Sequence, residues 1–393
     1  MTPAARIQSA IELLDAVIQA ARSSGPPADR ILSEWFRAHR FAGSKDRRAI
    51  RELVYDAIRA CGPVPGSGRA AMLRLAETDP PLAQLFDGSN YGPAPIDPGE
   101  PAAEGGIAPA WLMERLAASG VSGEEAEALL SRAPLDIRVN ALKASRDTIR
   151  LPEPAEKLAA PGALRLPAGT QVEQWEEYRS GIIEVQDGGS QLACEAVHAM
   201  PGETVIDLCA GAGGKTLALA AAMRDEGRIV AADTDRGRLS RLGPRAERAG
   251  VSNIQTVLLD PDRELEMLEG WRNVADAVLV DAPCSGTGTW RRNPEARWRL
   301  TEAQLTGYVQ TQDRLLDIAA ELVKPGGRIT FVTCSLLDDE GAERIAAFVA
   351  RHPDWHAVAS ELQRGIQRGQ GVRLSPLHHG TDGFFIACAG KPC

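Results

Sequence analysis

The stretch Thr204-Val-Ile-Asp-Leu-Cys-Ala-Gly-Ala-Gly-Gly-Lys-Thr216 decides the fold of this chain. It opens with apolar residues that are typical of a short buried strand, and it leads into the apolar helical pattern of Lys215–Met223. Glycines at 211, 213 and 214 let the intervening backbone turn tightly and approach a ligand closely, because glycine has no Cβ. The stretch therefore predicts a strand, a glycine-rich loop and a helix in immediate succession.

The same alternation of strand and helix continues along the rest of the chain. We expect strands over Thr204–Leu208, Arg228–Ala232, Ile254–Leu259, Ala277–Val280, Arg328–Thr333 and Gly383–Ala387. We expect helices over Lys215–Met223, Arg236–Ala249, Thr311–Leu322 and Gly341–Arg351. This alternation predicts an α/β fold with a doubly wound, Rossmann-like parallel sheet, in which ligands bind beyond the carboxyl ends of the strands.

Patterning before the sheet predicts two further domains. Ile7, Ile11 and Leu14 recur at helical spacing, which indicates an all-α N-terminal region. The three expected domains are a helical region at 1–130, a small α+β domain at 131–184 and the α/β domain at 185–393. The helical region contains a Pro/Gly-rich linker at 63–106, with a short helix expected near Ala70–Leu75.

Composition limits the class of protein. With 44% hydrophobic and 25% charged residues, the chain has the composition of an ordinary globular protein. Its longest apolar runs, such as Ala277–Val280, have the length of strands, so we expect no membrane span. The N-terminal helix contains Glu12 and Asp15 and lacks the layout of a signal peptide, which predicts a cytoplasmic protein.

The seven cysteines predict free thiols. Their number is odd and no two of them form a CxxC pair, which argues against a disulfide framework and against a zinc site. We therefore expect no metal.

Basic residues gather in two places although the net charge is −9. Arg30–Arg59 holds eight Lys/Arg against four Asp/Glu, and Trp290–Arg299 holds four Arg against one Glu. Local patches decide whether a surface can follow a nucleic-acid backbone. Either patch can also be a solvated or packed surface segment.

The glycine-rich loop predicts a ligand that contains adenosine. Free N–H groups at the start of the following helix suit an anion, and Asp233, 20 residues after Gly213, suits the hydroxyls of a ribose. A P-loop ATPase is the main alternative, because Gly214-Lys-Thr216 matches the end of that motif. Cys209 stands where that motif needs its first glycine, however, and a P-loop has no role for Asp233. A nicotinamide-dependent dehydrogenase is disfavoured by Lys215, which would meet the pyrophosphate without a purpose.

Two cysteines follow two of the expected strands, in Asp281-Ala-Pro-Cys284-Ser285 and in Thr333-Cys334-Ser335. Consecutive strands are usually neighbours, so we expect both thiols to face one bound base, with Asp281 beside them. A thiolate that adds to carbon 6 of a cytosine makes carbon 5 able to attack a methyl sulfonium, and a second group must then assist release. Asp281 would accept from the cytosine amino group or, as a neutral acid, donate to N3; the residues leave both roles open.

At these residues the chain resembles the Sun family of RNA cytosine-C5 methyltransferases. The matching stretches are Asp207–Thr216, Asp281-Ala-Pro-Cys-Ser-Gly-Thr-Gly288, Arg291-Arg-Asn-Pro-Glu295, Thr333–Ser335 and His379-Gly-Thr-Asp-Gly-Phe-Phe385. The resemblance implies Cys334 as the nucleophile and Cys284 as the group that assists release, with Asp281 near the methyl donor and the base. It implies that S-adenosylmethionine is held by Cys209, Ala210, Gly211, Ala212, Gly213, Gly214, Lys215, Asp233, Asp260 and Asp281. Asp233 would bind the ribose and Asp260 would lie near the adenine. The family usually has proline where this chain has Ala212, which makes the loop less rigid before binding.

The N-terminal region is similar to the NusB-like RNA-binding domain of the family's small-subunit rRNA methyltransferase B group. Asp29-Arg-Ile-Leu and Asp46–Tyr55 carry that likeness. Leu135-Asp-Ile-Arg-Val-Asn140 resembles the start of the family's small substrate-positioning domain. The resemblance implies methylation of RNA, 16S rRNA first, and a monomer suffices for this mechanism. The alternatives are a tRNA cytosine-C5 methyltransferase, a DNA cytosine methyltransferase and a non-catalytic RNA-binding ribosome assembly factor. Arg and Trp side chains of Trp290–Arg299 would grip phosphates and stack on unpaired bases.

Overall fold

The computed structural model describes residues 1–359, 362 and 364–393, and the chain divides into two compact units. The helical unit consists of Met1–Ser131 and Thr289–Thr301. The sheet unit consists of Arg132–Gly288 and Glu302–Cys393. The small sheet and the large sheet thus belong to one unit, and a segment from the middle of the sequence belongs to the helical one.

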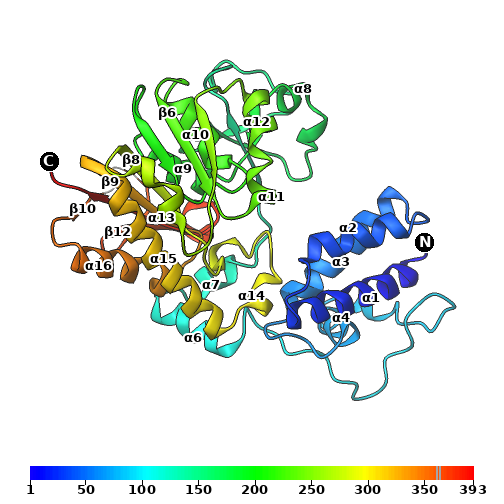
Figure 1. Cartoon of the computed structure of the whole chain (residues 1–393). Coiled ribbons are helices and arrows are strands. Elements are labelled where there is room, and N and C mark those ends of the chain that lie inside the picture. The colour runs from blue at the N-terminus through cyan, green and yellow to red at the C-terminus, as the bar shows by residue number, and fades with distance from the viewer. Residues whose placement is uncertain (360–361, 363) are drawn as a thin grey trace. The chain divides into compact units, whose positions relative to one another are not determined.

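The helical unit is built around its first four helices, which pack together (Figure 1). Its helices are α1 (Pro3–Arg22), α2 (Ala28–Ala38), α3 (Ser44–Ala60), α4 (Gly68–Ala76), α5 (Pro80–Ala83), α6 (Ala110–Ala118), α7 (Glu124–Ala128) and α14 (Ala296–Arg299). Apolar residues at helical spacing, such as Ile7, Leu14 and Ile50, are fully or almost fully buried between them. The hydroxyl of Thr2 caps α1 by accepting from the Ala5 N–H at 3.2 Å. No helix in the described part of the chain is both long and apolar enough to cross a membrane.

The expected Pro/Gly-rich linker contains part of the helical core. Gly68, at the start of α4, donates its N–H to Asp15 Oδ1 on α1 at 2.6 Å. A Cβ at this position would lie 2.2 Å from the carbonyl oxygen of Ile11, so only glycine allows the two helices this close. Met72 of α4 is fully buried. This first part of segment 63–106 is therefore not a linker but a packed element.

The small sheet has four antiparallel strands in the order β2-β3-β1-β4. They are β1 (Leu135–Val139), β2 (Glu156–Lys157), β3 (Ala163–Leu166) and β4 (Ile183–Val185), with η1 (Val172–Gln174) and α8 (Glu176–Arg179) between β3 and β4. Asp136 joins this sheet to the rest of the unit, because its buried carboxylate accepts from Arg165 Nε at 2.7 Å and from the Gly188 N–H at 3.1 Å. Asn140 Nδ2 donates to the carbonyl of Ala249 at 2.9 Å.

The large sheet has the order β11-β12-β13-β9-β8-β5-β6-β7, with β10 paired to β13. Its strands are β5 (Thr204–Asp207), β6 (Arg228–Asp233), β7 (Ile254–Leu258), β8 (Ala275–Asp281), β9 (Val323–Thr333), β10 (His356–Val358), β11 (Ile366–Arg368), β12 (Gly371–Leu374) and β13 (Phe384–Gly390). Strands β7, β6, β5, β8 and β9 are parallel, as predicted.

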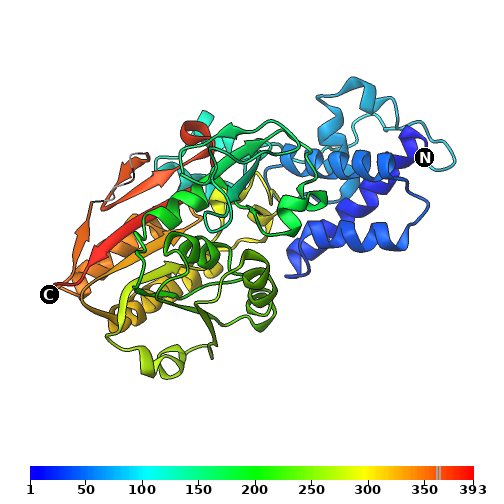
Figure 2. The same cartoon turned by 90° about the horizontal axis from the view of Figure 1, so that it is seen from above.

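The prediction of a wholly parallel sheet is wrong for the C-terminal strands, which pair antiparallel and lie beside β9 (Figure 2). The connection from Leu374 to Phe384 is too short for the crossover that parallel strands require. The sheet is therefore mixed: a parallel Rossmann-like half and an antiparallel edge.

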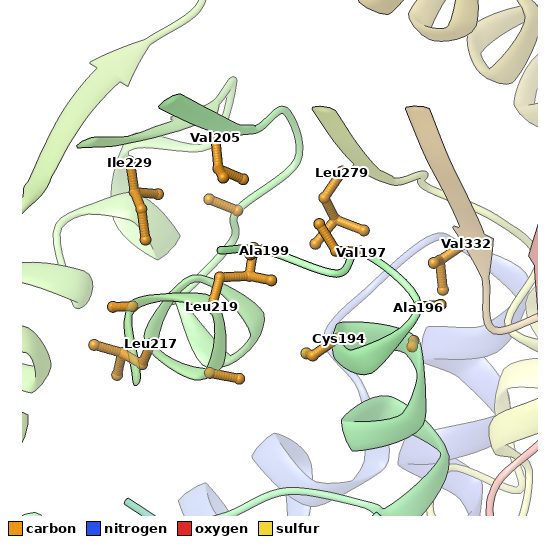
Figure 3. Close-up of a cluster of buried hydrophobic side chains, with 14 of the residues drawn as sticks. Cys194, Ala196, Val197, Ala199, Val205, Leu217, Leu219, Ile229, Leu279 and Val332 are labelled. Carbon is orange, nitrogen blue, oxygen red and sulfur yellow. The ribbon is translucent and has the colours of Figure 1, made fainter. Parts of the chain in front are cut away.

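Helices cover both faces of the large sheet. They are α9 (Gly188–Glu195), α10 (Gly214–Ala222), α11 (Arg236–Leu239), α12 (Leu242–Ala249), α13 (Glu264–Met267), α15 (Glu302–Leu322), α16 (Ala342–Arg351) and α17 (Pro376–His379), with the short turns η2 (Glu269–Trp271), η3 (Thr287–Thr289) and η4 (Asp338–Glu340). Successive strand residues point to opposite faces. Val205 and Leu279 pack against α10 and the end of α9 (Figure 3), whereas Ile206 and Val280 pack in the cluster with α15 and α16. The expected single helix over Arg236–Ala249 is two helices, because Pro244 fits only the first turn of a helix and α12 begins anew at Leu242.

Candidate functional site

The glycine-rich loop connects β5 to α10 at the carboxyl edge of the parallel strands. Gly211 and Gly213 have φ angles of 56° and 84°, the left-handed region that favours glycine. A Cβ on Gly213 would also lie 2.1 Å from Leu242 Cδ1. Gly213 is the N-cap of α10, and in the described part of the chain no side chain caps that helix start. The first N–H groups of α10 therefore remain available to a ligand.

Asp233, at the end of β6, holds this loop in place. Its Oδ2 accepts from the Gly211 N–H at 2.7 Å, and its Oδ1 accepts from the Asp235 N–H at 2.7 Å. The carboxylate is almost fully buried yet lines a cavity at this edge. Asp233 can therefore organise the loop and offer its remaining lone pairs to a ligand.

Asp207 lies beneath the loop with one oxygen unpaired. Thr216 Oγ1 donates to Asp207 Oδ2 at 2.6 Å, while Oδ1 has no hydrogen-bond partner among the described residues. Burial raises the pKa of Asp207 to about 7, although the bond from Thr216 favours the ionised form. An unpaired buried acceptor of this kind is uncommon and indicates a missing donor.

Lys215 and Asp281 form an ion pair that links α10 to the end of β8. Lys215 Nζ lies 2.6 Å from Asp281 Oδ2 and 5.8 Å from the centroid of the Phe384 ring. Burial opposes the charge of Lys215, but the charges of Asp281, Cys194 and Cys334 outweigh it and raise the pKa of Lys215. A positive charge is thus held within electrostatic reach of Cys334.

The two cysteines meet as the sequence predicts. Cys284 Sγ and Cys334 Sγ lie 3.4 Å apart, within hydrogen-bond distance for thiols. Gly288 donates its N–H to the Cys334 carbonyl at 2.9 Å and accepts from the Gly383 N–H at 2.8 Å. The stretches around Cys284, Cys334 and Gly383, 99 residues apart at the extremes, are therefore joined through their backbones.

A cavity of about 340 Å³ connects the thiols with Asp233. This volume is within the range of roughly 300–1,000 Å³ that is typical of ligand pockets. Its lining includes Cys209, Asp233, Leu259, Pro261, Asp281, Cys284 and Cys334. The predicted loop residues Ala210, Gly211, Ala212, Gly213, Gly214 and Lys215 are absent from this lining and contribute through their backbone or through the ion pair. Asp260 is exposed and also lies outside the lining, between two residues that belong to it.

Charges around the two thiols differ. The hydrogen bond with Cys334, followed by burial and the nearby carboxylate of Glu340, raises the pKa of Cys284 well above its usual value. The raised pKa favours the protonated form of the Cys284 thiol, while either sulfur can donate in the contact between them. Lys215 lies on the Cys334 side of this pair and Glu340 on the Cys284 side.

Glu340 is a site residue that the sequence analysis missed. It ends the acidic run Asp338-Asp339-Glu340, which reads as exposed, yet its side chain is fully buried. It accepts from the Ser285 N–H at 2.8 Å and from Gln312 Nε2 at 3.2 Å. No motif marked it, because its donors come from distant parts of the sequence.

Segment Trp290–Arg299, which was expected to grip RNA, is instead anchored in the helical unit. Trp290 and Arg297 are fully buried and Trp298 nearly so. Arg297 Nη2 donates to the carbonyls of Ile58 and Cys61, each at 2.7 Å. Trp298 Nε1 donates to the carbonyl of Gly62 at 3.1 Å. These side chains hold the segment in place, so they are not free to bind phosphates or bases.

The other basic patch keeps an open surface. Ser33, Phe36, Arg37, Arg40, Arg47, Arg48 and Arg51 of α2, α3 and the turn between them line a hollow of about 650 Å³. No acidic residue is among these seven. Phe41, beside the hollow in sequence, is 67% exposed. Arg30 and Arg59, at the ends of the patch, pair with Glu34 and Asp56.

Within the described residues, no group of three or more His, Cys, Asp or Glu side chains is arranged to hold a metal ion.

Comparisons with known proteins agree with this geometry. Residues 195–389 match the family model described as 16S rRNA methyltransferase RsmB/F. Probable ribosomal RNA small subunit methyltransferase B of Synechocystis sp. is 33% identical over 295 residues, 71% of this chain and 66% of that relative. Ribosomal RNA small subunit methyltransferase B of Citrobacter koseri is 34% identical over 287 residues, 71% of this chain and 65% of that relative. The chain thus spans slightly less than two thirds of the length of these curated relatives.

Solved structures extend the likeness over the full fold. The crystal structure of PH0851 has a TM-score of 0.77 and 28% identity, and the match covers 100% of this chain and 99% of that one. A methyltransferase homologue from Pyrococcus horikoshii has a TM-score of 0.60 and 28% identity over 72% of this chain and 99% of its own. The family resemblance read from the motifs is confirmed. Through residues 195–389 and these relatives, the chain belongs to the RsmB/F family of methyltransferases.

Proposed function

We propose that this protein transfers a methyl group from S-adenosylmethionine to carbon 5 of a cytosine in RNA, with small-subunit rRNA as the substrate. The observation that carries the proposal is the thiol pair Cys284 and Cys334, 3.4 Å apart, in one cavity with Asp233 and Asp281. Simple binding of RNA needs neither thiol. Carbon 5 methylation needs a nucleophile and a releasing group at one base, and this cavity offers both.

Residues around the loop fit the methyl donor. The uncapped start of α10 suits a carboxylate, and Asp207 Oδ1 is a buried acceptor without a donor, which suits an ammonium group. Asp233, at the other side of the loop, faces the cavity and suits ribose hydroxyls. Leu259 and Pro261 give that end an apolar wall suited to adenine. When bound, the donor supplies an electrophilic methyl group on a sulfonium.

Cys334 is the nucleophile in this proposal. The Cys284 thiol lies within hydrogen-bond distance of the Cys334 sulfur, and the ammonium of Lys215 is within electrostatic reach of that sulfur, where its positive charge can stabilise the attacking atom. The Cys334 thiolate adds to carbon 6 of cytosine and forms an S–C6 bond, and carbon 5 becomes the atom that takes the methyl group. Asp281, paired with Lys215, accepts from the exocyclic amino group.

Cys284 serves the release step. Once Cys334 is bonded to carbon 6, its sulfur is a thioether and no longer carries the charge that keeps the proton on Cys284. The largest cause of the raised pKa of Cys284 is then lost. Cys284 can then lose its proton to solvent, and its thiolate takes the carbon 5 proton, after which the S–C6 bond breaks and the Cys334 thiolate is restored.

The arginine hollow of the helical unit is the proposed site for the RNA backbone. Arg37, Arg40 and Arg48 are exposed and can each pair with a phosphate. Exposed Phe41 offers a face for an unpaired base. We propose that this helical unit plays the part of a NusB-like RNA-binding domain, that the protein acts as a monomer because one chain supplies every group, and that it works in the cytoplasm, where thiols stay reduced.

A covalent trap tests the proposal. Cells expressing Cys284→Ala should accumulate RNA that stays bound to the protein through denaturation, because attack still occurs while release does not. The adduct should disappear in Cys284→Ala/Cys334→Ala, and Cys393→Ala, which changes an exposed thiol outside the cavity, should form none.

Each result of that trap has a consequence. Sequencing the trapped RNA should return 16S rRNA, whereas tRNA would overturn the substrate assignment. Absence of any adduct, with purified Cys284→Ala still binding 16S rRNA and S-adenosylmethionine, would contradict the assigned cysteine roles and favour an assembly factor without catalysis.

A further inference from the structure

One buried carboxylate connects both cysteine motifs. Glu340 lies in η4, between β9 and α16, and its side chain is fully buried. Burial raises its pKa, while hydrogen bonds from Ser285, Ser335 and Gln312 favour the ionised form. Burying a carboxylate costs free energy unless hydrogen-bond donors surround it. Its donors here are the residues next to the two thiols.

Hydrogen bonds that involve Glu340 and Gln312 fix the residues on both sides of Cys284. Gln312 Nε2 donates to the carbonyl of Pro283 at 3.0 Å and to Glu340 Oε1 at 3.2 Å. On the other side, the Ser285 N–H donates to the same Glu340 oxygen at 2.8 Å, and the Ser285 hydroxyl bonds the second oxygen. The residues immediately before and after Cys284 are therefore tied, directly or through Gln312, to Glu340.

Cys334 is held by different means. It directly follows Thr333, the last residue of β9, which pairs with Phe385 of β13. Its next residue, Ser335, also bonds Glu340, and it is further fixed by Thr287 Oγ1 at 3.1 Å and by Ser285 Oγ at 3.2 Å. Cys284, in contrast, lies three residues beyond the end of β8, in backbone that is neither helix nor strand. Cys334 therefore has sheet hydrogen bonds in addition to side-chain bonds, whereas side-chain bonds hold the segment of Cys284.

We propose that Glu340, acting with Gln312, is a positioning residue that holds Cys284 at the reacting base for the release step. The inference rests on the proposed function. Without Glu340, the Pro283–Ser285 segment loses the bonds that fix it, while β9 still presents Cys334. Attack at carbon 6 continues and removal of the carbon 5 proton slows, so the covalent intermediate accumulates. A displacement of about 1 Å at a reacting group can cost roughly 10²-fold in rate.

The test compares adduct levels in Glu340→Ala, Gln312→Ala and Glu340→Gln with those in wild type and Cys284→Ala. Purified proteins are incubated with 16S rRNA and S-adenosylmethionine, quenched in denaturant and resolved by electrophoresis. We expect Glu340→Ala and Gln312→Ala to accumulate the covalent adduct, because its breakdown is slowed by roughly 10²-fold while its formation changes little. Glu340→Gln keeps an acceptor for the Ser285 N–H and should restore part of the resolution rate. Glu343→Ala, one turn further on and 61% exposed, is the matched control and should behave as wild type.

The outcomes separate this inference from the proposed function. If Cys284→Ala traps RNA and Glu340→Ala and Gln312→Ala resolve the adduct at the wild-type rate, Glu340 does not position Cys284. If the variants slow the formation and the breakdown of the adduct by the same factor, Glu340 has only a structural role and the inference also fails. If Glu340→Ala does not fold, Gln312→Ala and Glu340→Gln decide between the same results. If Cys284→Ala itself traps nothing, the proposed function is what has failed.

Discussion

The sulfur atoms of Cys284 and Cys334 lie 3.4 Å apart beyond the ends of the neighbouring parallel strands β8 and β9. Their surroundings are unequal: Lys215 places positive charge near Cys334, and Glu340 places negative charge near Cys284. This asymmetry gives two chemically identical side chains different electrostatic surroundings, which supports the different roles proposed for them.

Removing Cys334 should make Cys284 easier to ionise. The hydrogen bond with Cys334 is the largest cause of the raised pKa of Cys284, so Cys334→Ala should lower that pKa toward the ordinary value. Alkylation of Cys284 by iodoacetamide, followed by peptide mass spectrometry from about pH 7 to 10, should shift to lower pH. Cys393, exposed at the C-terminus, is the internal control. An unchanged profile for Cys284 would show that Cys334 does not hold its proton in place.

Asp207 should make folding stability depend on pH. Its pKa of about 7 lies above the ordinary value of 3.8, so the native state keeps a proton that the unfolded chain releases between these two values. The resulting stability is fully present below the unfolded pKa and is lost as pH rises through about 7. In urea unfolding, the free energy of unfolding of Asp207→Asn should therefore fall less than that of wild type between about pH 5 and pH 8.

The exposed residue Asp354 provides the control for this linkage. Asp354→Asn should keep the wild-type pH dependence. Parallel curves for Asp207→Asn and wild type would mean that burial of Asp207 does not bind a proton in the native state.

Neutralising the arginine hollow should weaken RNA binding mainly at low salt. In Arg37→Gln/Arg40→Gln/Arg48→Gln, each lost phosphate contact should reduce the slope of log affinity against log salt by about 0.7. Fluorescence anisotropy with a single-stranded 16S fragment at several salt concentrations measures that slope. Arg236→Gln, an exposed change in the sheet unit, is the control. A slope equal to that of wild type would remove the hollow from the RNA-binding surface.

Arg297 should stabilise the helical unit rather than bind RNA. Burial lowers its pKa to about 9, and its guanidinium pairs with the carbonyls of Ile58 and Cys61. Arg297→Met leaves these buried acceptors unpaired, at a cost of about 3 kcal/mol in the free energy of unfolding. Thermal unfolding and limited proteolysis of residues 1–131 should both report the loss. If Arg297→Met unfolds like wild type but binds RNA more weakly, the side chain belongs to the RNA surface after all.

The parallel half of the sheet could be predicted because β5, β6 and β8 are largely apolar runs buried on both faces, although β7 is partly exposed. The runs from Thr204, Arg228, Ile254 and Ala277 begin within two residues of the observed strands. Strands β10 to β12 were missed, since they have three or four residues each and carry no long apolar run. The helix expected from Thr311 begins nine residues earlier, at Glu302. Its first turns were missed because they are polar and mostly exposed.

At the site, the sequence located the residues whose chemistry is local. The meeting of Cys284 and Cys334 followed from strand order alone. The burial of Glu340 and Arg297 did not, because each depends on partners brought together only by the tertiary fold: Ser285 and Gln312 for Glu340, and carbonyls near residue 60 for Arg297. Nothing in a short acidic or basic run distinguishes a solvated charge from one that organises a site.

The most direct test of the central claim is to identify the methylated nucleoside. Purified protein is incubated with unmodified 16S rRNA and methyl-labelled S-adenosylmethionine, and the RNA is digested to nucleosides for mass spectrometry. The account predicts labelled 5-methylcytidine with wild type and none with Cys334→Ala. Label in any other nucleoside, or 5-methylcytidine formed at the wild-type rate by Cys334→Ala, would contradict it.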